Sequence, residues 1–64
     1  MPVLNAIADA VATCEAYSRT AREFADLGDV KGVVYAVRCA SAAILSAADL
    51  TSELRPARTD RGAA

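Results

Sequence analysis

Apolar residues recur at helical spacing over two long segments of the chain. In the first segment, residues 2–27, they return every three or four positions, which is the period of an amphipathic helix. Charged and hydroxyl side chains fill the opposite side, which we expect to face water. The predicted inward stripe of this helix consists of Val3, Leu4, Ile7, Ala10, Val11, Cys14, Tyr17, Ser18, Ala21, Phe24 and Ala25.

The two residues that follow carry a turn signal. Gly28 comes after the last apolar position of the first segment, where many helices end on a left-handed residue that glycine adopts without strain. Asp29 precedes a new apolar run, so its carboxylate is placed to cap the next helix. A connection this short leaves two helices as antiparallel neighbours.

The second segment predicts a helix over about residues 30–54 with a wide apolar side. On a helical wheel the apolar arc covers roughly 200°, about twice the width that contact with one partner helix requires. We therefore expect the first helix to cover only part of this arc and a second chain to cover the rest. The predicted interface consists of Val30, Val33, Val34, Val37, Ala40, Ser41, Ile44, Ala47, Ala48, Thr51 and Leu54, with Ala36, Ala43 and Leu50 widening it.

A turn at residues 28–29 also fixes which residues lie level in the two helices. The levels pair Val33 with Phe24, Ala40 with Tyr17, Ile44 with Thr13 and Cys14, Ala47 with Ala10, and Leu54 with Val3. Large side chains then face small ones, as interdigitating layers require. The fold predicted for residues 1–54 is all-α, an antiparallel two-helix hairpin that dimerisation completes as a four-helix bundle. Residues 55–64 lack large apolar groups and are predicted to form a disordered tail.

A chain of 64 residues is short for independent stability. Natural domains of this size usually gain stability from disulfides, a metal or a partner chain. The only two cysteines, Cys14 and Cys39, lie inside the predicted helices, and there is no histidine, so neither a disulfide framework nor a zinc site is predicted. Association with another chain is the remaining source of stability.

The sequence offers little catalytic chemistry. No basic residue is placed to hold either thiol as a thiolate, and the carboxylates lie on solvated faces near arginines, as Glu15 does with Arg19. The three glycines are scattered and form no phosphate-binding loop. We therefore expect no enzymatic activity, no cofactor and no bound metal.

The composition also bears on location and on nucleic acid. The apolar run from Val33 to Ala48 has roughly 16 residues and contains Arg38, whereas a membrane span needs about 20; we expect no membrane and a cytoplasmic location.

The charge balance bears on nucleic-acid binding. Residues 1–54 hold four Lys or Arg and seven Asp or Glu, a balance of 4 − 7 = −3. Only the tail, with Arg55, Arg58 and Arg61, could contact phosphate, and weakly.

Part of the hairpin follows the order of a known repeat. An aromatic, a small residue, an aromatic, a turn and a small residue occur in turn at Tyr17, Ala21, Phe24, Gly28, Asp29 and Ala40. Over roughly half the chain this resembles one tetratricopeptide repeat, which implies a helical hairpin. Val33 and Val37 depart from that family, which favours a small residue and an aromatic there. Any tight hairpin needs small residues where its helices cross, so the resemblance adds only the hairpin.

These observations predict a small non-enzymatic interaction module that self-associates through the apolar face of the second helix. A second hypothesis is an adaptor or inhibitor that captures a helix of a heterologous host protein on the same face. A third is a nucleic-acid-associated regulator that acts weakly through the arginines of the tail. If the chain becomes helical only when a host protein is present, the adaptor hypothesis is favoured over self-association. Deletion of residues 55–64 tests the nucleic-acid hypothesis.

Overall fold

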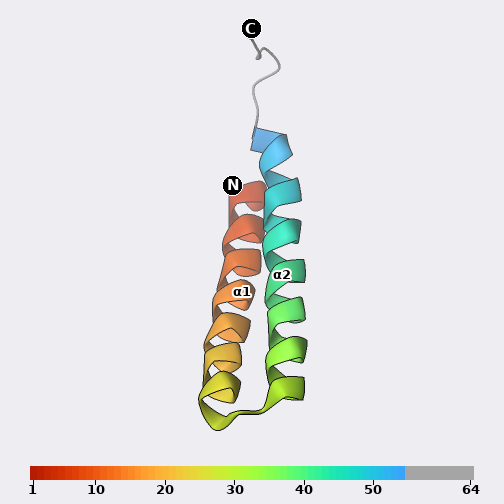
Figure 1. Cartoon of the computed structure of the whole chain (residues 1–64). Helices are drawn as coiled ribbons and strands as arrows, with labels where there is room; N and C mark the ends of the chain where they lie inside the picture. The colour runs from red at the N-terminus through yellow and green to blue at the C-terminus, as the bar shows by residue number, and fades with distance from the viewer. Residues whose placement is uncertain (55–64) are drawn as a thin grey trace, which may run out of the picture.

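The chain folds as two long helices joined by a two-residue turn (Figure 1). The computed structural model describes residues 1–54, in which α1 spans Pro2–Leu27, α2 spans Val30–Leu50, and a 3-10 helix, η1, spans Thr51–Leu54. The helices lie side by side and antiparallel, so the N-terminus and η1 are at the same end of the molecule. The predicted all-α hairpin is therefore confirmed.

The turn depends on the left-handed backbone conformation of Gly28 and on the side-chain carboxylate of Asp29. Gly28 has φ 74° and ψ 19°, and its N–H donates to the carbonyl of Ala25 at 3.0 Å. The N–H of Asp29 donates to the carbonyl of Phe24 at 2.9 Å, which completes the Schellman arrangement at the end of α1. The Asp29 carboxylate then accepts from the N–H of Gly32 at 2.9 Å and caps α2.

The second helix changes form in its last turn. The hydroxyls of Thr51 and Ser52 donate to the carbonyls of Ala48 and Asp49 at 2.6 and 2.8 Å. Such side-chain bonds to the preceding turn compete with regular helix geometry. The sequence predicts one helix through residue 54, whereas the structure ends α2 at Leu50 and continues as η1. The predicted tail, residues 55–64, lies outside the described residues.

Helix α1 packs against the alanine side of α2. In the part of the chain that the structure describes, the three buried residues are Ala36, Ala40 and Ala47, with exposed fractions of 0%, 9% and 3%. Half-buried residues complete the two facing rows, in which spacings of three and four residues alternate as in antiparallel helix bundles. The rows are Val3, Ile7, Ala10, Cys14, Tyr17, Ala21 and Phe24 on α1, and Val33, Ala36, Ala40, Ala43, Ala47 and Leu50 on α2.

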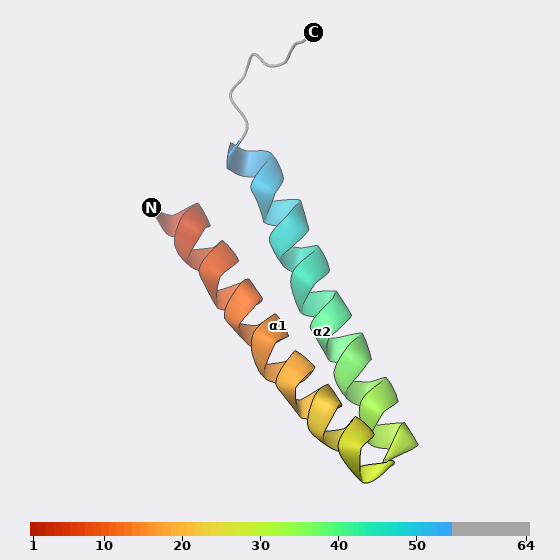
Figure 2. The same cartoon turned by 60° about the vertical axis from the view of Figure 1, so that its left-hand side comes forward.

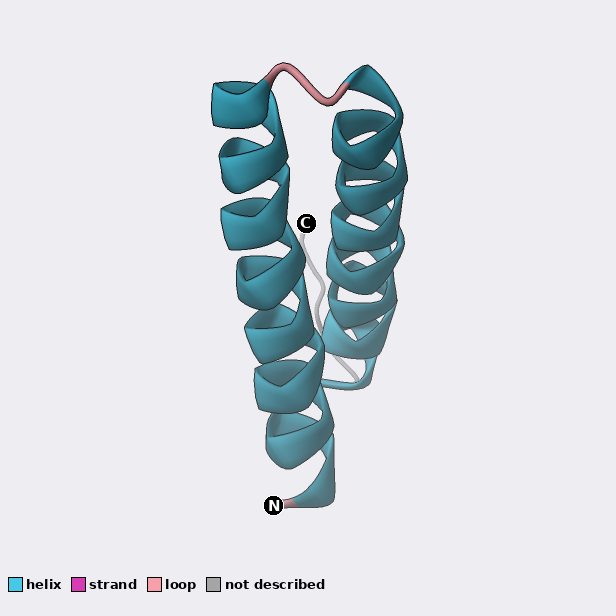
Figure 3. Cartoon of the chain, turned by 90° about the horizontal axis from the view of Figure 1, so that it is seen from below, coloured by secondary structure: helices cyan, strands magenta, loops and turns pink. Residues whose placement is uncertain are grey.

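The hairpin is one helix thick. Its extents are 49 × 25 × 13 Å, and the shortest is close to the diameter of a single helix, about 10–12 Å. The radius of gyration is 15.6 Å, whereas a compact domain of this length has about 10 Å. The views in Figures 2 and 3 show the same two rods with no third layer on either side. Each helix therefore has only one helical neighbour within residues 1–54.

Candidate interaction surface

The larger apolar side chains of α2 lie outside the hairpin, while its buried residues are all alanine. Val37 is 48% exposed, Ile44 is 45% exposed and Leu45 is 64% exposed. By contrast, Ala36 is fully buried. Burial normally favours the larger side chains, because the free energy gained grows with the apolar area removed from water. This hairpin buries the small residues of α2 and leaves the large ones in solvent.

Several exposed apolar residues of α2, with Ser41 among them and Thr51 of η1 at the end, form a second row, and Leu45 lies outside it. We call this row the α2 stripe: Val30, Val34, Val37, Ser41, Ile44, Ala48 and Thr51. Its spacings alternate between four and three residues, the same repeat that the row facing α1 has. All seven side chains are exposed, and none is charged. One helix thus carries two neighbouring packing rows, of which α1 covers one.

The predicted interface residues divide between these two rows. Ala40 and Ala47 are buried against α1, and Val33 is half-buried in the same row. The other predicted residues, Val30, Val34, Val37, Ser41, Ile44, Ala48, Thr51 and Leu54, are exposed. Ala36 and Ala43, which the sequence predicts as widening this interface, face α1 instead. The alanines are therefore used within the chain, and most of the valines and the isoleucine remain exposed.

Ile44 does not lie in the row of α2 that faces α1. Ile44 is 45% exposed and lies in the α2 stripe, whereas Cys14 is half-buried in the row of α1 that faces α2. The physical reason is the closeness of the alanine contact, which turns the flank of α2 that carries Ile44 away from α1. Cys39 is also half-buried, and both cysteines are free thiols.

A pair of aromatic rings marks one side of the hairpin. The rings of Tyr17 and Tyr35 lie edge to face, with centroids 6.3 Å apart and planes at 77°. The pKa of the Tyr35 phenol is raised above its ordinary value of 10.0, chiefly by hydrogen bonding and charge interaction with Cys39, and then by Tyr17. Val37 and Ile44 follow Tyr35 by two and nine residues, which at about 100° per residue places them on the opposite side of α2.

Two residues of α1 lie on the same side as the α2 stripe. Leu4 and Val11 are 50% and 36% exposed, although the sequence predicts them in the inward stripe of the first helix. They precede Tyr17 by thirteen and six residues, so they lie about 120–140° around α1 from that ring, beyond the row that faces α2. We call the α2 stripe together with Leu4 and Val11 the open face. A helical wheel could have shown that Leu4 and Val11 lie at the edge of the inward stripe, because each follows a residue of the facing row, Val3 or Ala10, by one position.

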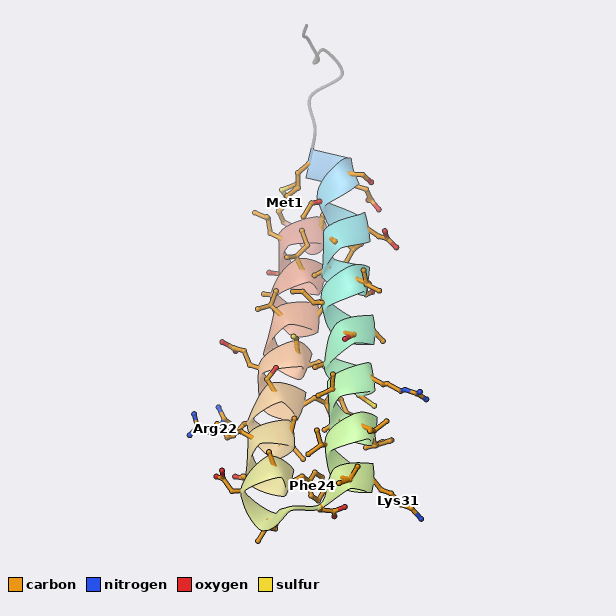
Figure 4. All side chains as sticks on the ribbon, in the orientation of Figure 1. Met1, Arg22, Phe24 and Lys31 are labelled. Carbon is orange, nitrogen blue, oxygen red and sulfur yellow. The ribbon has the colours of Figure 1, made fainter. Side chains whose placement is uncertain are left out.

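Charged side chains border the open face. Arg22 of α1 and Lys31 of α2 extend from opposite edges of the hairpin, while Phe24 lies between the helices near the turn (Figure 4). A shallow groove of about 480 Å³ on α2 adjoins the open face, and Lys31 and Arg38 stand among its apolar walls. The lining consists of Val30, Lys31, Val34, Tyr35, Arg38, Cys39 and Ala42. A second groove, about 610 Å³ and rich in charged residues, lies along α1.

Residues 1–54 bring together no group of three His, Cys, Asp or Glu side chains that could hold a metal ion. The segment Val30–Leu54 is long and apolar enough, by length and composition alone, to cross a membrane. Its apolar character comes from the two packing rows described above, and Arg38 stands near its middle. The open face is thus the most developed surface feature of the described chain.

Comparison of the chain with protein-family models, with curated proteins and with solved structures gives no match. The inference of function therefore depends on the surface itself.

Proposed function

We propose that this chain is a small interaction module that self-associates through its open face, two hairpins together forming a four-helix bundle. The observation that carries the proposal is the reversed burial in α2, where alanines are inside and Val37 and Ile44 are outside. Apolar surface collected on one side of a soluble chain is typical of a protein interface. A second hairpin laid on the open face would give each helix the second neighbour that it lacks.

The energetics favour such pairing. Full burial of a valine or isoleucine side chain is worth about 1.5–3 kcal/mol. Val37 and Ile44 are 48% and 45% exposed, so covering them on both copies gains roughly half of that value for each side chain, still a sizeable fraction of the stability of a small domain. The hairpin alone buries three alanines among its described residues, and these contribute little area. No charge interrupts the α2 stripe, so its burial carries no penalty for desolvating an ion.

Sedimentation of two matched variants tests the proposal. We expect the wild-type chain to sediment as a dimer at micromolar concentration and Ile44→Asp to be monomeric or unfolded, because a buried carboxylate costs several kcal/mol. Ser46→Asp adds the same charge two residues further along, on the opposite side of α2, and should leave the dimer intact. A stable, fully helical wild-type monomer at this concentration would contradict the proposal.

The alternative of a heterologous partner uses the same face and differs in what orders the chain. If the isolated chain is poorly helical and becomes ordered only with a host-derived protein, the adaptor hypothesis replaces self-association. Flotation with lipid vesicles distinguishes both from insertion of Val30–Leu54 into a membrane. The arginines of a possible nucleic-acid contact belong to residues 55–64, outside the described structure, and deletion of that segment tests their role.

A further inference from the structure

The α2 stripe is symmetric about Ser41. Val37 precedes Ser41 by four residues and Ile44 follows it by three, while Val34 and Ala48 stand seven residues to either side. If a second α2 lies antiparallel on the first and is centred on Ser41, Val34 comes level with Ala48 of the partner subunit, and Val37 comes within one residue of the level of Ile44 of the partner subunit. A row that is its own match in the reversed direction suits a two-fold interface.

The charges on α2 favour the same direction. Lys31 and Arg38 are the basic residues of α2 and lie in its first half, while Asp49 and, in η1, Glu53 lie beyond its centre. All four are exposed. Antiparallel pairing brings the basic half of each helix beside the acidic end of the other, and parallel pairing would set like charges together. Exposed ion pairs contribute little affinity, so the charges select the orientation and the apolar row supplies the affinity.

The composition of α1 argues against the other way of stacking two hairpins, in which α1 lies on α2 of the partner subunit. Along the side of α1 that carries Val11, the next positions in the same row are Glu15, Ser18 and Arg22. That arrangement would press a carboxylate and a guanidinium against an uncharged row of valine and isoleucine, which costs free energy. Pairing α2 with α2 keeps these charges off the uncharged row of valine and isoleucine.

We infer that the partner is a second copy of this chain, bound with its α2 antiparallel to α2 and the two-fold axis passing beside Ser41. The inference rests on the proposed self-association and adds its partner helix, direction and register. The Ser41 side chains of the two copies meet at the axis, where each hydroxyl has the other as a hydrogen-bond partner.

Cross-linking tests the register. In a chain with Cys14→Ser and Cys39→Ser, Ser41→Cys should give at least about tenfold more linked dimer, with mild oxidation or a short bis-maleimide, than Ser46→Cys, because two thiols held at the axis have a high effective concentration. Ser46→Cys is the matched control, since it makes the same replacement at an exposed position on another side of α2. If the serine background loses its helicity, the same comparison is made with both native cysteines kept, and mass spectrometry locates the bond.

A mixing experiment tests the direction. Val34→Cys and Ala48→Cys should each link poorly alone and should link to one another when the two proteins are mixed. Sedimentation of the same samples separates the two proposals. A wild-type dimer without the Ser41→Cys link, or without the mixed link, overturns the register and leaves self-association standing. A wild-type monomer overturns both.

Discussion

The contact between Phe24 and Gly32 shows how a single side chain limits what the sequence tolerates near the turn. A Cβ added at Gly32 would stand 2.6 Å from the ring of Phe24, much closer than normal contact. Glycine in a helix is about 1 kcal/mol less favourable than alanine, yet here it makes room for the largest apolar side chain next to the turn. The gain in packing at Phe24 thus offsets the weaker helix at Gly32.

Gly32→Ala should therefore lower the free energy of unfolding, although alanine is the better helix former. We expect a loss of about 1–2 kcal/mol, because displacing the ring costs more than the propensity gained. Ala42→Gly, on an exposed side of α2, measures the propensity difference by itself. Urea unfolding followed by circular dichroism gives both values. An increase in stability for Gly32→Ala would show that the ring moves aside without cost.

Residue size explains why the sequence does not reveal the inward side of α2. The apolar pattern places Ala40 and Ala47 in the predicted interface with a second chain, whereas the structure packs both against α1. Hydrophobicity alone ranks Ile44 above both of them. Alanine wins the contact with α1 because it lets the two helices approach closely, a choice that depends on the shapes of both helices at once. The apolar pattern of the first helix has a similar ambiguity. It places Leu4 and Val11 in the predicted inward stripe, although both side chains are exposed in the structure.

At the scale of the element, the boundaries of both helices near the turn follow from local chemistry. Gly28 ends α1 by its left-handed backbone, and Asp29 begins α2 by accepting from the N–H of Gly32. Such signals involve residues close in sequence, so they can be predicted without tertiary structure. The far end of α2 depends instead on how Thr51 and Ser52 bond to the preceding carbonyls, and the sequence pattern does not show that choice.

Asp29→Ala removes the side-chain cap of α2 and should destabilise the hairpin by about 1 kcal/mol. Asp29→Asn keeps an acceptor of the same shape and should retain most of the stability. Thermal unfolding of the two variants beside the wild type measures the difference. Equal losses in both would indicate that the charge of Asp29, through the helix dipole, matters more than its hydrogen bond.

At the scale of the whole molecule, the thickness of 13 Å limits how much the chain can bury by itself. The described residues include no buried side chain larger than alanine. A second hairpin on the open face would convert a pair of rods into a bundle with a closed apolar centre. The sequence predicts the need for a second chain from the width of the apolar arc. The side of the hairpin that we propose for its binding becomes visible only when α1 is in place.

The stability of a self-associating hairpin should depend on protein concentration. For folding coupled to dimerisation, each tenfold rise in concentration stabilises the folded dimer by about 1.4 kcal/mol, so the midpoint of thermal unfolding should rise over a dilution series. Ile44→Asp, where it remains folded, should show a midpoint independent of concentration. A wild-type midpoint that stays constant over a hundredfold range would count against association.

The slenderness of the hairpin also bears on how long such a chain survives in a cell. Each helix packs against another helix on one side only, so local unfolding exposes its backbone amides easily. Proteases cleave the fraction of chains that is locally unfolded. In the proposed dimer the valine and isoleucine row would be covered, whereas in the monomer it is exposed. The rate of synthesis would then affect the rate of degradation as well as the amount of protein. At low concentration a larger fraction of the chains is monomeric, and monomers would be degraded faster.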